Sequence, residues 1–343
     1  MVRYSSVSPM EITAQAPCRV DMAGGTLDIW PLYLFHPGAV TVNFAITRYA
    51  SCTVRTHRGS RIVLRSRDLA CEESFPSLEA LRAARRLRLP LPARVVRYFA
   101  PQVGLTVTTH SESPAGAGIA GSSALMIALS AAMNRLAGTG HRPEKVREIA
   151  QSIETQVIRV PTGCQDYFPA LYGGVNAIGL TEAGFARQPL NVDFEDLNAR
   201  VVLAYTGVPR NSGINNWEVM KAHIDCDRAV FRNFERITAI AAAMRGAVEA
   251  GHWNEAGRLL RTEWAHRRKN APGISTPLID RLVEAARHAG ALGGKVCGAG
   301  GGGCVFFLVE HGARARVEAA IEREGGRVLP VRVAAQGVRL QVK

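Results

Sequence analysis

Residues 114–124 read Pro-Ala-Gly-Ala-Gly-Ile-Ala-Gly-Ser-Ser-Ala and are the most distinctive local feature of the sequence. This stretch leads into the apolar segment Ser122–Leu136, which we expect to be a helix. The first N–H groups of a helix have no internal acceptor, and the helix dipole makes that end partially positive. Small residues let phosphate oxygens reach those donors, and serine hydroxyls can cap the helix or reach a metal ion. The sequence therefore predicts a phosphate-binding loop made of Pro114, Gly116, Ala117, Gly118, Ile119, Ala120, Gly121, Ser122 and Ser123.

The same glycines match two other nucleotide-binding motifs, each of them incompletely. Gly116, Gly118 and Gly121 satisfy the G-x-G-x-x-G fingerprint of dinucleotide-binding folds, but no strand ending in an acidic residue follows about 20 residues later. Gly116 and Gly121 also have the spacing of a P-loop, yet Ser122 stands where that motif requires lysine. A standard P-loop is therefore excluded. A glycine turn before a buried helix, with no ligand, is the structural alternative.

A second cluster lies earlier in the chain, around the turn Gly24-Gly25, which follows an extended run that begins at Glu11. Arg19 precedes this turn and Asp28 follows it. Arginine suits the charge that develops on a transferring phosphoryl group because its planar fork donates several hydrogen bonds. An aspartate can accept hydrogen bonds from sugar hydroxyls. The cluster predicts a catalytic or substrate-binding role, with an ordinary surface salt bridge as the alternative.

The third glycine cluster, Gly298–Gly303, has five glycines in six residues and comes directly before an apolar strand, Val305–Val309. Such a run costs backbone entropy. Close approach to a ligand, or to the other glycine loop, would explain that cost, whereas a flexible connector is the alternative.

Two carboxylates lie between these clusters. Glu154 is near the end of a predicted helix, Pro143–Val157, and Asp166 follows a Pro-Thr-Gly turn. Phosphoryl transfer needs ligands for Mg²⁺ and a carboxylate that orients or deprotonates the attacking hydroxyl. Glu154 and Asp166 could divide those two tasks, although acidic pairs at this spacing are common.

The bulk properties favour a small-molecule enzyme over a nucleic-acid-binding protein. The formal net charge is +13 and the basic residues are mostly arginine, but no zinc-finger, basic-zipper or ribonucleoprotein motif accompanies them. We therefore do not expect a nucleic-acid partner. A positive field would also attract nucleotides and sugar phosphates. Seven cysteines without a C-x-x-C pair, no signal peptide and no apolar run of membrane-spanning length lead us to expect a cytoplasmic protein with no membrane contact.

The 343 residues suffice for two domains that share a cleft. Strand and helix patterns alternate irregularly, which predicts an α+β protein in two halves, 1–190 and 191–343. The expected strands are 11–16, 39–46, 50–56, 61–65, 105–110, 173–180, 199–205, 305–309 and 328–333. The expected helices are 78–87, 122–136, 143–157, 215–250, 253–264, 277–289 and 313–323.

Taken together, the clusters resemble the GHMP kinases, the superfamily of galactokinase, homoserine kinase and mevalonate kinase. The order matches: an early Ala-Pro-x-Arg-Val segment, the Pro-x-Gly-x-Gly loop ending in Ser-Ser-Ala, an internal acidic turn and a late glycine run. The resemblance covers residue 16 to about residue 309. It implies a two-domain fold, with an N-terminal α/β domain like ribosomal protein S5 and a C-terminal ferredoxin-like α+β domain. It also implies ATP and Mg²⁺ as cofactors.

Details of the motifs resemble the sugar-kinase branch. The segment 16–28 is similar to the opening motif of galactokinase, and residues 163–176 are similar to D-glycero-D-manno-heptose 7-phosphate kinase. Gly25 and Thr26 differ from galactokinase, and Cys164 differs from the heptose kinases. The resemblance implies phosphorylation of a sugar or sugar phosphate, at the anomeric hydroxyl in the heptose kinases. A kinase of a non-sugar alcohol, such as mevalonate or homoserine, and a catalytically silent ligand-binding homologue are the alternatives.

This resemblance implies a role for each candidate residue. Asp166 and Arg19 are catalytic, and the metal ion is held by Glu154 and Ser123, with Ser122 as the alternative hydroxyl. The residues expected to bind substrate are Asp28, Gly25, Thr26, Gly163, Gly300 and Gly301. The partner is a small-molecule substrate, and a homodimer is left open.

Overall fold

The computed structural model describes residues 10–209 and 212–343, with the backbone alone at 212–215. The N-terminal half is built on an eight-stranded sheet. Its strands are β1 (Glu11–Ala23), β2 (Val40–His57), β3 (Ile62–Ser66), β4 (Cys71–Phe75), β5 (Gly104–Ser111), β6 (Val175–Thr181), β7 (Gly184–Pro189) and β12 (Arg339–Val342). The main order is β12-β1-β2-β5-β3-β4, and β6 and β7 continue the sheet from the first part of β2.

Strand β2 replaces the two strands predicted at 39–46 and 50–56. It is 18 residues long and pairs with β6 over Val40–Phe44 and with β5 over Ala50–His57. The first part is buried on both faces, whereas the second part alternates buried and more exposed residues. The change in pattern at residues 47–49 looks like a break in the sequence, but in the structure it marks a change of neighbours along one strand.

Helices pack against this sheet and supply much of the N-terminal core. They are α1 (Leu78–Ala83), α2 (Pro90–Phe99), α3 (Gly121–Ala137), α4 (Pro143–Ile158) and α5 (Tyr167–Tyr172). Helix α3 contacts both β1 and β2, and its residues are apolar nearly all round, which fits a helix in the middle of the core. Its first turn therefore has a fixed position relative to β1, the strand that carries Arg19.

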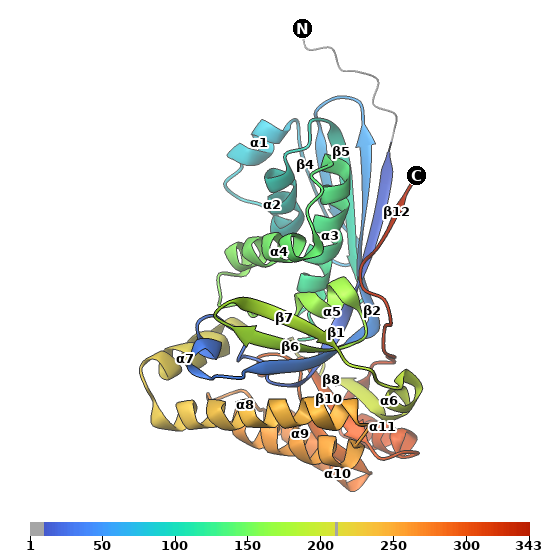
Figure 1. The fold of residues 1–343 in the computed structure, drawn as a ribbon. Coiled ribbons are helices and arrows are strands. Elements are labelled where there is room, and N and C mark those ends of the chain that lie inside the picture. The colour runs from blue at the N-terminus through green and yellow to red at the C-terminus, as the bar shows by residue number, and fades with distance from the viewer. Residues whose placement is uncertain (1–9, 210–211) are drawn as a thin grey trace.

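The C-terminal half packs helices against a four-stranded antiparallel sheet of order β11-β8-β10-β9. This order is the ferredoxin-like arrangement that the resemblance implies. Its elements are α6 (Phe194–Arg200), β8 (Val201–Tyr205), α7 (Ser212–Ile224), α8 (Arg228–Glu249), α9 (Trp253–Arg267), α10 (Pro277–His288), β9 (Ala291–Val296), β10 (Cys304–Val309), α11 (Arg314–Arg323) and β11 (Arg327–Val328). Figure 1 shows the two halves stacked along the long axis of the molecule, with α1–α4 at one end and α8–α11 at the other.

Two predicted elements of the C-terminal half are wrong. The single helix expected over 215–250 is two helices, because Cys226 takes a left-handed φ of 60° and Asp227 caps α8 by accepting hydrogen bonds from the N–H groups of Ala229 and Val230. The strand expected over 328–333 is limited to β11, and Val333 instead bridges to Ile46 in the N-terminal sheet.

The end of the chain returns to the N-terminal half. Strand β12 pairs antiparallel with β1, with Ile12 opposite Val342 and Gln15 opposite Arg339. Residues 339–342 therefore extend the N-terminal sheet, whereas the predicted division assigned 191–343 to the C-terminal half. One hydrophobic core cluster also includes residues of both halves, among them Phe44 and Phe306, whose rings lie 5.7 Å apart.

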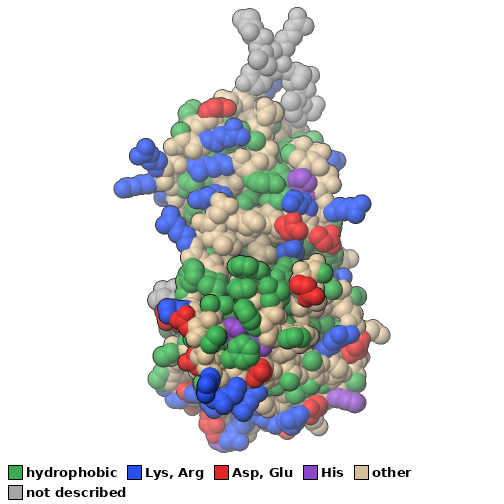
Figure 2. Space-filling model, turned by 60° about the vertical axis from the view of Figure 1, so that its left-hand side comes forward, with side chains coloured by type: hydrophobic (Ala, Val, Ile, Leu, Met, Phe, Trp, Pro, Cys, Tyr) green, Lys and Arg blue, Asp and Glu red, His purple; other side chains and the backbone are tan. Residues whose placement is uncertain are grey.

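Helix α7 crosses between the two halves beside the short 3₁₀ helix η1 (Leu32–Phe35). His36, which follows η1, and His223 of α7 are both buried, with their Nε2 atoms 2.7 Å apart. Hydrophobic side chains gather across the middle of the face seen in Figure 2, with basic side chains above and below them. Both elements carry exposed apolar residues, including Phe35 and Trp217.

Candidate active site

The predicted phosphate loop leads into the N-terminus of α3. The first N–H groups of an α-helix have no intrahelical acceptor. Ala120 precedes α3 in a left-handed conformation, and its side chain cannot supply the missing acceptor. A cleft of about 400 Å³ opens at this end of the helix. Among the predicted loop residues, Pro114, Gly116, Ala117, Gly118, Ala120, Gly121, Ser122 and Ser123 line the cleft, and Ile119 is buried beneath it.

Two other segments hold the loop in place. The Arg19 N–H of β1 donates to Ile119 O at 3.0 Å, and the Cys304 N–H of β10 donates to Ala117 O at 2.7 Å. Gly303 lies so close that a Cβ there would be 2.7 Å from Ala117 O. The third glycine cluster therefore packs against the first, which is one of the two explanations that its composition predicted.

Arg19 and Asp166 meet at the edge of the loop, although they are 147 residues apart in the chain. Arg19 Nη2 lies 2.5 Å and Nε 2.9 Å from Asp166 Oδ1, and Nη1 donates to Gly118 O at 2.8 Å. Burial opposes the charged guanidinium, but the carboxylates of Asp166 and Asp21 outweigh burial and raise the pKa of Arg19. The Asp166 side chain is 21% exposed, so a small molecule in the cleft can reach it.

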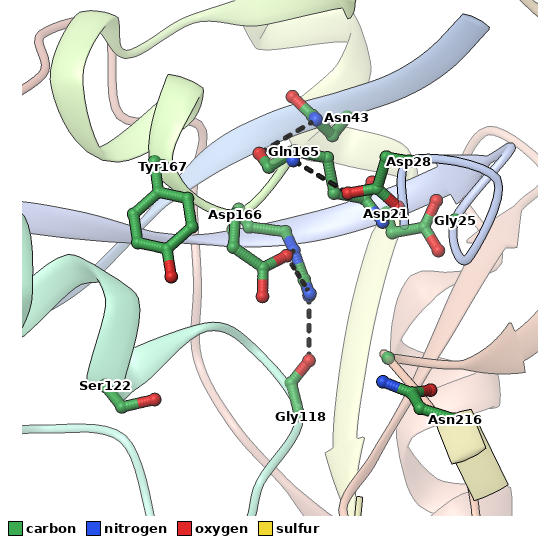
Figure 3. Close-up of polar contacts among 12 residues, drawn as sticks. Asp21, Gly25, Asp28, Asn43, Gly118, Ser122, Gln165, Asp166, Tyr167 and Asn216 are labelled. Carbon is green, nitrogen blue, oxygen red and sulfur yellow. Dashed lines mark hydrogen bonds and ion pairs between the residues drawn. The ribbon is translucent and has the colours of Figure 1, made fainter. Parts of the chain in front are cut away.

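Asp28 lines a smaller pocket of about 50 Å³ that shares Asp166 and Gly163 with the phosphate cleft. Its Oδ2 accepts the Gln165 N–H at 2.8 Å. A Cβ on Gly163 would lie 1.9 Å from the same oxygen, so only glycine fits there. Burial and the nearby charge of Asp166 raise the pKa of Asp28 to about 7. Figure 3 shows Asp28, Gln165 and Asp166 on one side of Gly118, with Ser122 and Asn216 flanking it.

The other predicted substrate residues have different positions. Thr26 lines the small pocket, as does Gly163. Gly25 is buried, and a Cβ there would lie 2.3 Å from Asp21 Oδ2, so it closes against that carboxylate. Gly300 and Gly301 pack against Ile274, whose carbonyl accepts the Gly301 N–H at 2.9 Å. The neighbouring residues Gly298 and Ala299 line the pocket instead.

Glu154 faces the same cleft from the last turns of α4. Its Oε1 accepts the Ser122 hydroxyl at 2.6 Å and its Oε2 accepts the Tyr167 hydroxyl at 2.7 Å. Burial raises the pKa of Glu154, although these hydroxyls oppose the shift. Ser123 is buried beside the same carboxylate, whereas Ser122 is exposed to the cleft.

A carboxylate oxygen and serine hydroxyls are hard oxygen ligands of the kind that Mg²⁺ binds, together with phosphate oxygens and water. Their position at the cleft therefore fits a magnesium ion carried by a nucleotide. No cluster of three or more His, Cys, Asp or Glu side chains that could hold a metal ion occurs in residues 10–209 and 212–343. A site built by the protein alone is not found there.

A buried ion cluster lies behind the pocket, and one of its members, Arg267, also lines the pocket. Lys295 Nζ contacts Asp21 Oδ2 at 2.9 Å and Glu263 Oε1 at 3.0 Å, and Arg267 contacts the same two carboxylates at 3.4 and 3.1 Å. All four side chains are at most 4% exposed. Burial opposes the charge of Asp21, but Lys295 and Arg267 outweigh it and lower its pKa. Arg267 also donates to Gly25 O and to Gly298 O, so the cluster ties β1 to α9, β9 and the third glycine cluster.

Sequence reasoning did not find this cluster, and it also missed Asn216 of α7. Asn216 lines both the phosphate cleft and the small pocket, and its Nδ2 donates to Pro161 O at 3.2 Å. A polar residue on a predicted helix carries no signal of this kind.

In the sequence, Arg210, Asn211 and Ser212 follow the strand that ends at Tyr205, and their types suit either substrate contact or an ordinary polar loop. Arg210 and Asn211 lie outside the described residues, and Ser212 begins α7. A larger hollow of about 570 Å³ near Trp253 is lined by none of the described residues of the phosphate cleft.

Two family models match the chain over more than half of its length. Residues 81–174 match the GHMP kinases N-terminal domain, and residues 240–327 match the GHMP kinases C-terminal model. The chain belongs to the GHMP kinase family. GHMP kinases use ATP, so this protein is an ATP-dependent small-molecule kinase, and the α+β fold predicted from the sequence is confirmed.

Individual relatives differ in how much of the chain they cover. The chain is 25% identical to D-glycero-alpha-D-manno-heptose 7-phosphate kinase of Campylobacter jejuni over 96% of its own length and 98% of the relative. It is 27% identical to mevalonate kinase of Thermococcus sibiricus over 70% of each protein. The structure of Lactococcus lactis galactokinase complexed with galactose shares the fold, with a TM-score of 0.76, 19% identity and coverage of 96% and 95%. No helix among the described residues is both long and apolar enough to cross a membrane.

Proposed function

We propose that this GHMP kinase transfers the γ-phosphoryl group of ATP to a hydroxyl of a sugar or sugar phosphate, at the anomeric carbon. A heptose 7-phosphate is the first candidate acceptor, because similarity to the heptose kinase extends over nearly the whole of both chains. One observation carries the proposal: the pocket of Asp28, which suits hydroxyl groups, meets the phosphate cleft at Asp166 and Gly163. An acceptor hydroxyl bound there has Asp166 and the phosphate loop beside it.

Each residue then has a chemical task. The triphosphate lies along 116–123, where the free N–H groups of α3 donate to its oxygens. Asp166 accepts the proton of the acceptor hydroxyl, whose oxygen forms the new bond to phosphorus as the bond to the β-phosphate oxygen breaks. Arg19, held between Asp166 and Gly118 O, stabilises charge on the phosphoryl group.

Other groups orient the two substrates. Asp28, with a pKa of about 7, exchanges hydrogen bonds with sugar hydroxyls as donor or acceptor. Glu154 and a hydroxyl of the Ser122–Ser123 pair would hold Mg²⁺, which supplies neutralisation of phosphate charge when bound. Thr26, Gly163 and Asn216 also line the acceptor pocket.

A panel of acceptors tests the proposal. ATP-dependent release of ADP is measured with D-glycero-D-manno-heptose 7-phosphate, fucose, galactose, mannose, mevalonate and homoserine, and phosphorus NMR identifies an anomeric phosphate in the product. We expect turnover with one of the sugars and loss of that turnover in Asp166→Asn. Turnover with mevalonate alone would favour the non-sugar alternative, to which the partial similarity to mevalonate kinase points. No turnover with any acceptor would favour the catalytically silent alternative.

A further inference from the structure

Two tyrosines of α5 donate hydrogen bonds to two glutamates of α4. The Tyr167 hydroxyl lies 2.7 Å from Glu154 Oε2 and is fully buried, whereas the Tyr172 hydroxyl donates to Glu144 Oε1 near the surface. Both tyrosines therefore fasten the same pair of helices. Only Tyr167 bonds to a residue of the phosphate cleft.

The carboxylate of Glu154 is held on both oxygens. Ser122, which lines the cleft, donates to Oε1, and Tyr167, which does not line it, donates to Oε2. The hydrogen bond from Tyr167 thus orients the carboxylate so that its other oxygen, Oε1, faces the cleft. Without the tyrosine hydroxyl, Oε2 would lose its donor at 2.7 Å, which is unfavourable for a buried carboxylate, and the group would be less firmly held in this orientation.

The position of Tyr167 in the chain adds to this argument. Tyr167 follows Asp166 directly, and the turn before α5 sets both side chains. The Ser123 hydroxyl, the other hydroxyl beside Glu154, also interacts with the Tyr167 hydroxyl. One buried side chain therefore bonds to the carboxylate that would hold a metal ion, and it directly follows in the chain the residue proposed to accept the proton.

We propose that Tyr167 is a positioning residue that fixes Glu154 for a divalent cation at the phosphate cleft, an inference that rests on the proposed kinase function. Groups that orient a metal ligand commonly change metal affinity by about 10- to 100-fold when they are removed. The effect should appear in cation binding itself and not only in turnover.

The test uses Tyr167→Phe, which keeps the ring and removes only the hydroxyl, with Tyr172→Phe as the matched control on the same helix. Mn²⁺ binding is measured by electron paramagnetic resonance on the full chain in complex with a non-hydrolysable ATP analogue. We expect Tyr167→Phe to weaken Mn²⁺ binding about 10-fold or more. The affinity for the analogue without divalent metal should be unchanged, and Tyr172→Phe should bind Mn²⁺ as the wild type does. Thermal unfolding of both variants reports any loss of fold.

A double mutant separates positioning from general packing. If Tyr167 acts through Glu154, Tyr167→Phe causes no further loss of Mn²⁺ affinity in a Glu154→Gln background. Wild-type Mn²⁺ affinity in Tyr167→Phe, or an equal loss in both backgrounds, overturns the inference. The wild-type complex must also bind Mn²⁺ more tightly than the ATP analogue does alone. If it does not, the proposed role of Glu154 and the serines in holding the metal ion is wrong, whatever the effect of Tyr167→Phe.

Discussion

Two charged clusters each include a residue of β1, Arg19 in one and Asp21 in the other, and the clusters differ in how far they are exposed to the cleft. Arg19 of β1 pairs with Asp166 at the edge of the cleft, where Asp166 is 21% exposed. Asp21 of β1 pairs with Lys295 and Arg267 in a cluster where no side chain is more than 4% exposed. Side chains at positions i and i+2 of a strand point to the same face of the sheet, so the alternation along β1 does not explain the difference. The difference comes from the partners of each residue. Arg19 pairs with a residue of a loop that borders the cleft, whereas Asp21 pairs with residues of the packed elements α9 and β9.

Similar charged groups in the two clusters have different roles because they differ in exposure to the cleft. A substrate in the cleft can reach the carboxylate of Asp166, whereas the carboxylate of Asp21 is buried and contacts the cations beside it. Breaking a buried ion pair by removing one partner leaves an uncompensated charge. Substitutions in the first cluster should therefore affect turnover, and substitutions in the second should affect stability.

The largest expected effect is on catalysis. Asp166→Asn keeps the shape of the side chain but removes the proton acceptor, so we expect kcat to fall by about 10³-fold or more. The midpoint of thermal unfolding should fall less than in a variant of the second cluster, because Asp166 is partly exposed and Asp21 still lies near the buried Arg19. Steady-state kinetics with the accepted sugar and a thermal melt measure the two quantities. A variant that unfolds early but turns over normally when folded would reverse the roles of the two clusters.

Lys295→Met should show the opposite pattern. It leaves Asp21 and Glu263 buried with one cation fewer, and we expect the free energy of unfolding to fall by about 3 kcal/mol. Urea unfolding followed by circular dichroism gives this value. A loss of less than about 1 kcal/mol would mean that the buried cluster contributes little net stability.

The sequence predicts the first cluster better than the second for a physical reason. The phosphate loop, Arg19 and Asp166 lie in short segments whose local chemistry, such as glycines before a helix, is visible in the residues themselves. Lys295 and Asp21 are 274 residues apart, and nothing local to either residue indicates the other. Their pairing exists only because β9 and α9 pack behind β1.

The same limit applies to the errors in the fold. Strand β12 pairs with β1 from the other end of the chain. The polar and apolar residues of β12 alternate, which favours a strand, but all of them are exposed and nothing local indicates that β1 is the partner. The break between α7 and α8, by contrast, had a local signal that went unused, because Asp227 is a favourable helix N-cap. The resemblance predicts substrate contacts for Gly25, Gly300 and Gly301, and in the structure these glycines lie against other parts of the chain.

Asp28 lies near both Asp166 and Asp21, and its contribution to the free energy of unfolding should depend on pH. Its folded pKa is about 7 and the usual value is 3.8, so between these values the folded state keeps a proton that the unfolded state has lost. The wild type therefore loses stability as pH rises from about 4 through about 7. Asp28→Asn has no such loss, so its unfolding free energy relative to the wild type should rise by about 3 kcal/mol from pH 5 to pH 8. Parallel pH curves for the two proteins would show that Asp28 has no raised pKa.

The smallest effect on the free energy of unfolding is expected for an ion pair on the surface. Arg65 and Glu72 are joined at 2.6 Å across β3 and β4, but both side chains are about half exposed. Arg65→Gln should change the free energy of unfolding by less than about 0.5 kcal/mol and leave turnover unaltered. Urea unfolding beside Lys295→Met makes the contrast direct, and equal losses in the two variants would remove burial as the explanation.

The central claim is that the first turn of α3 receives a triphosphate next to Asp166. A crystal structure of the protein with a non-hydrolysable ATP analogue tests it most directly. The account predicts phosphate oxygens within hydrogen-bond distance of the N–H groups of 121–123, with the terminal phosphate facing Asp166 and Arg19. A nucleotide bound in another hollow, or lying in this cleft with its phosphates turned away from Asp166, would contradict it.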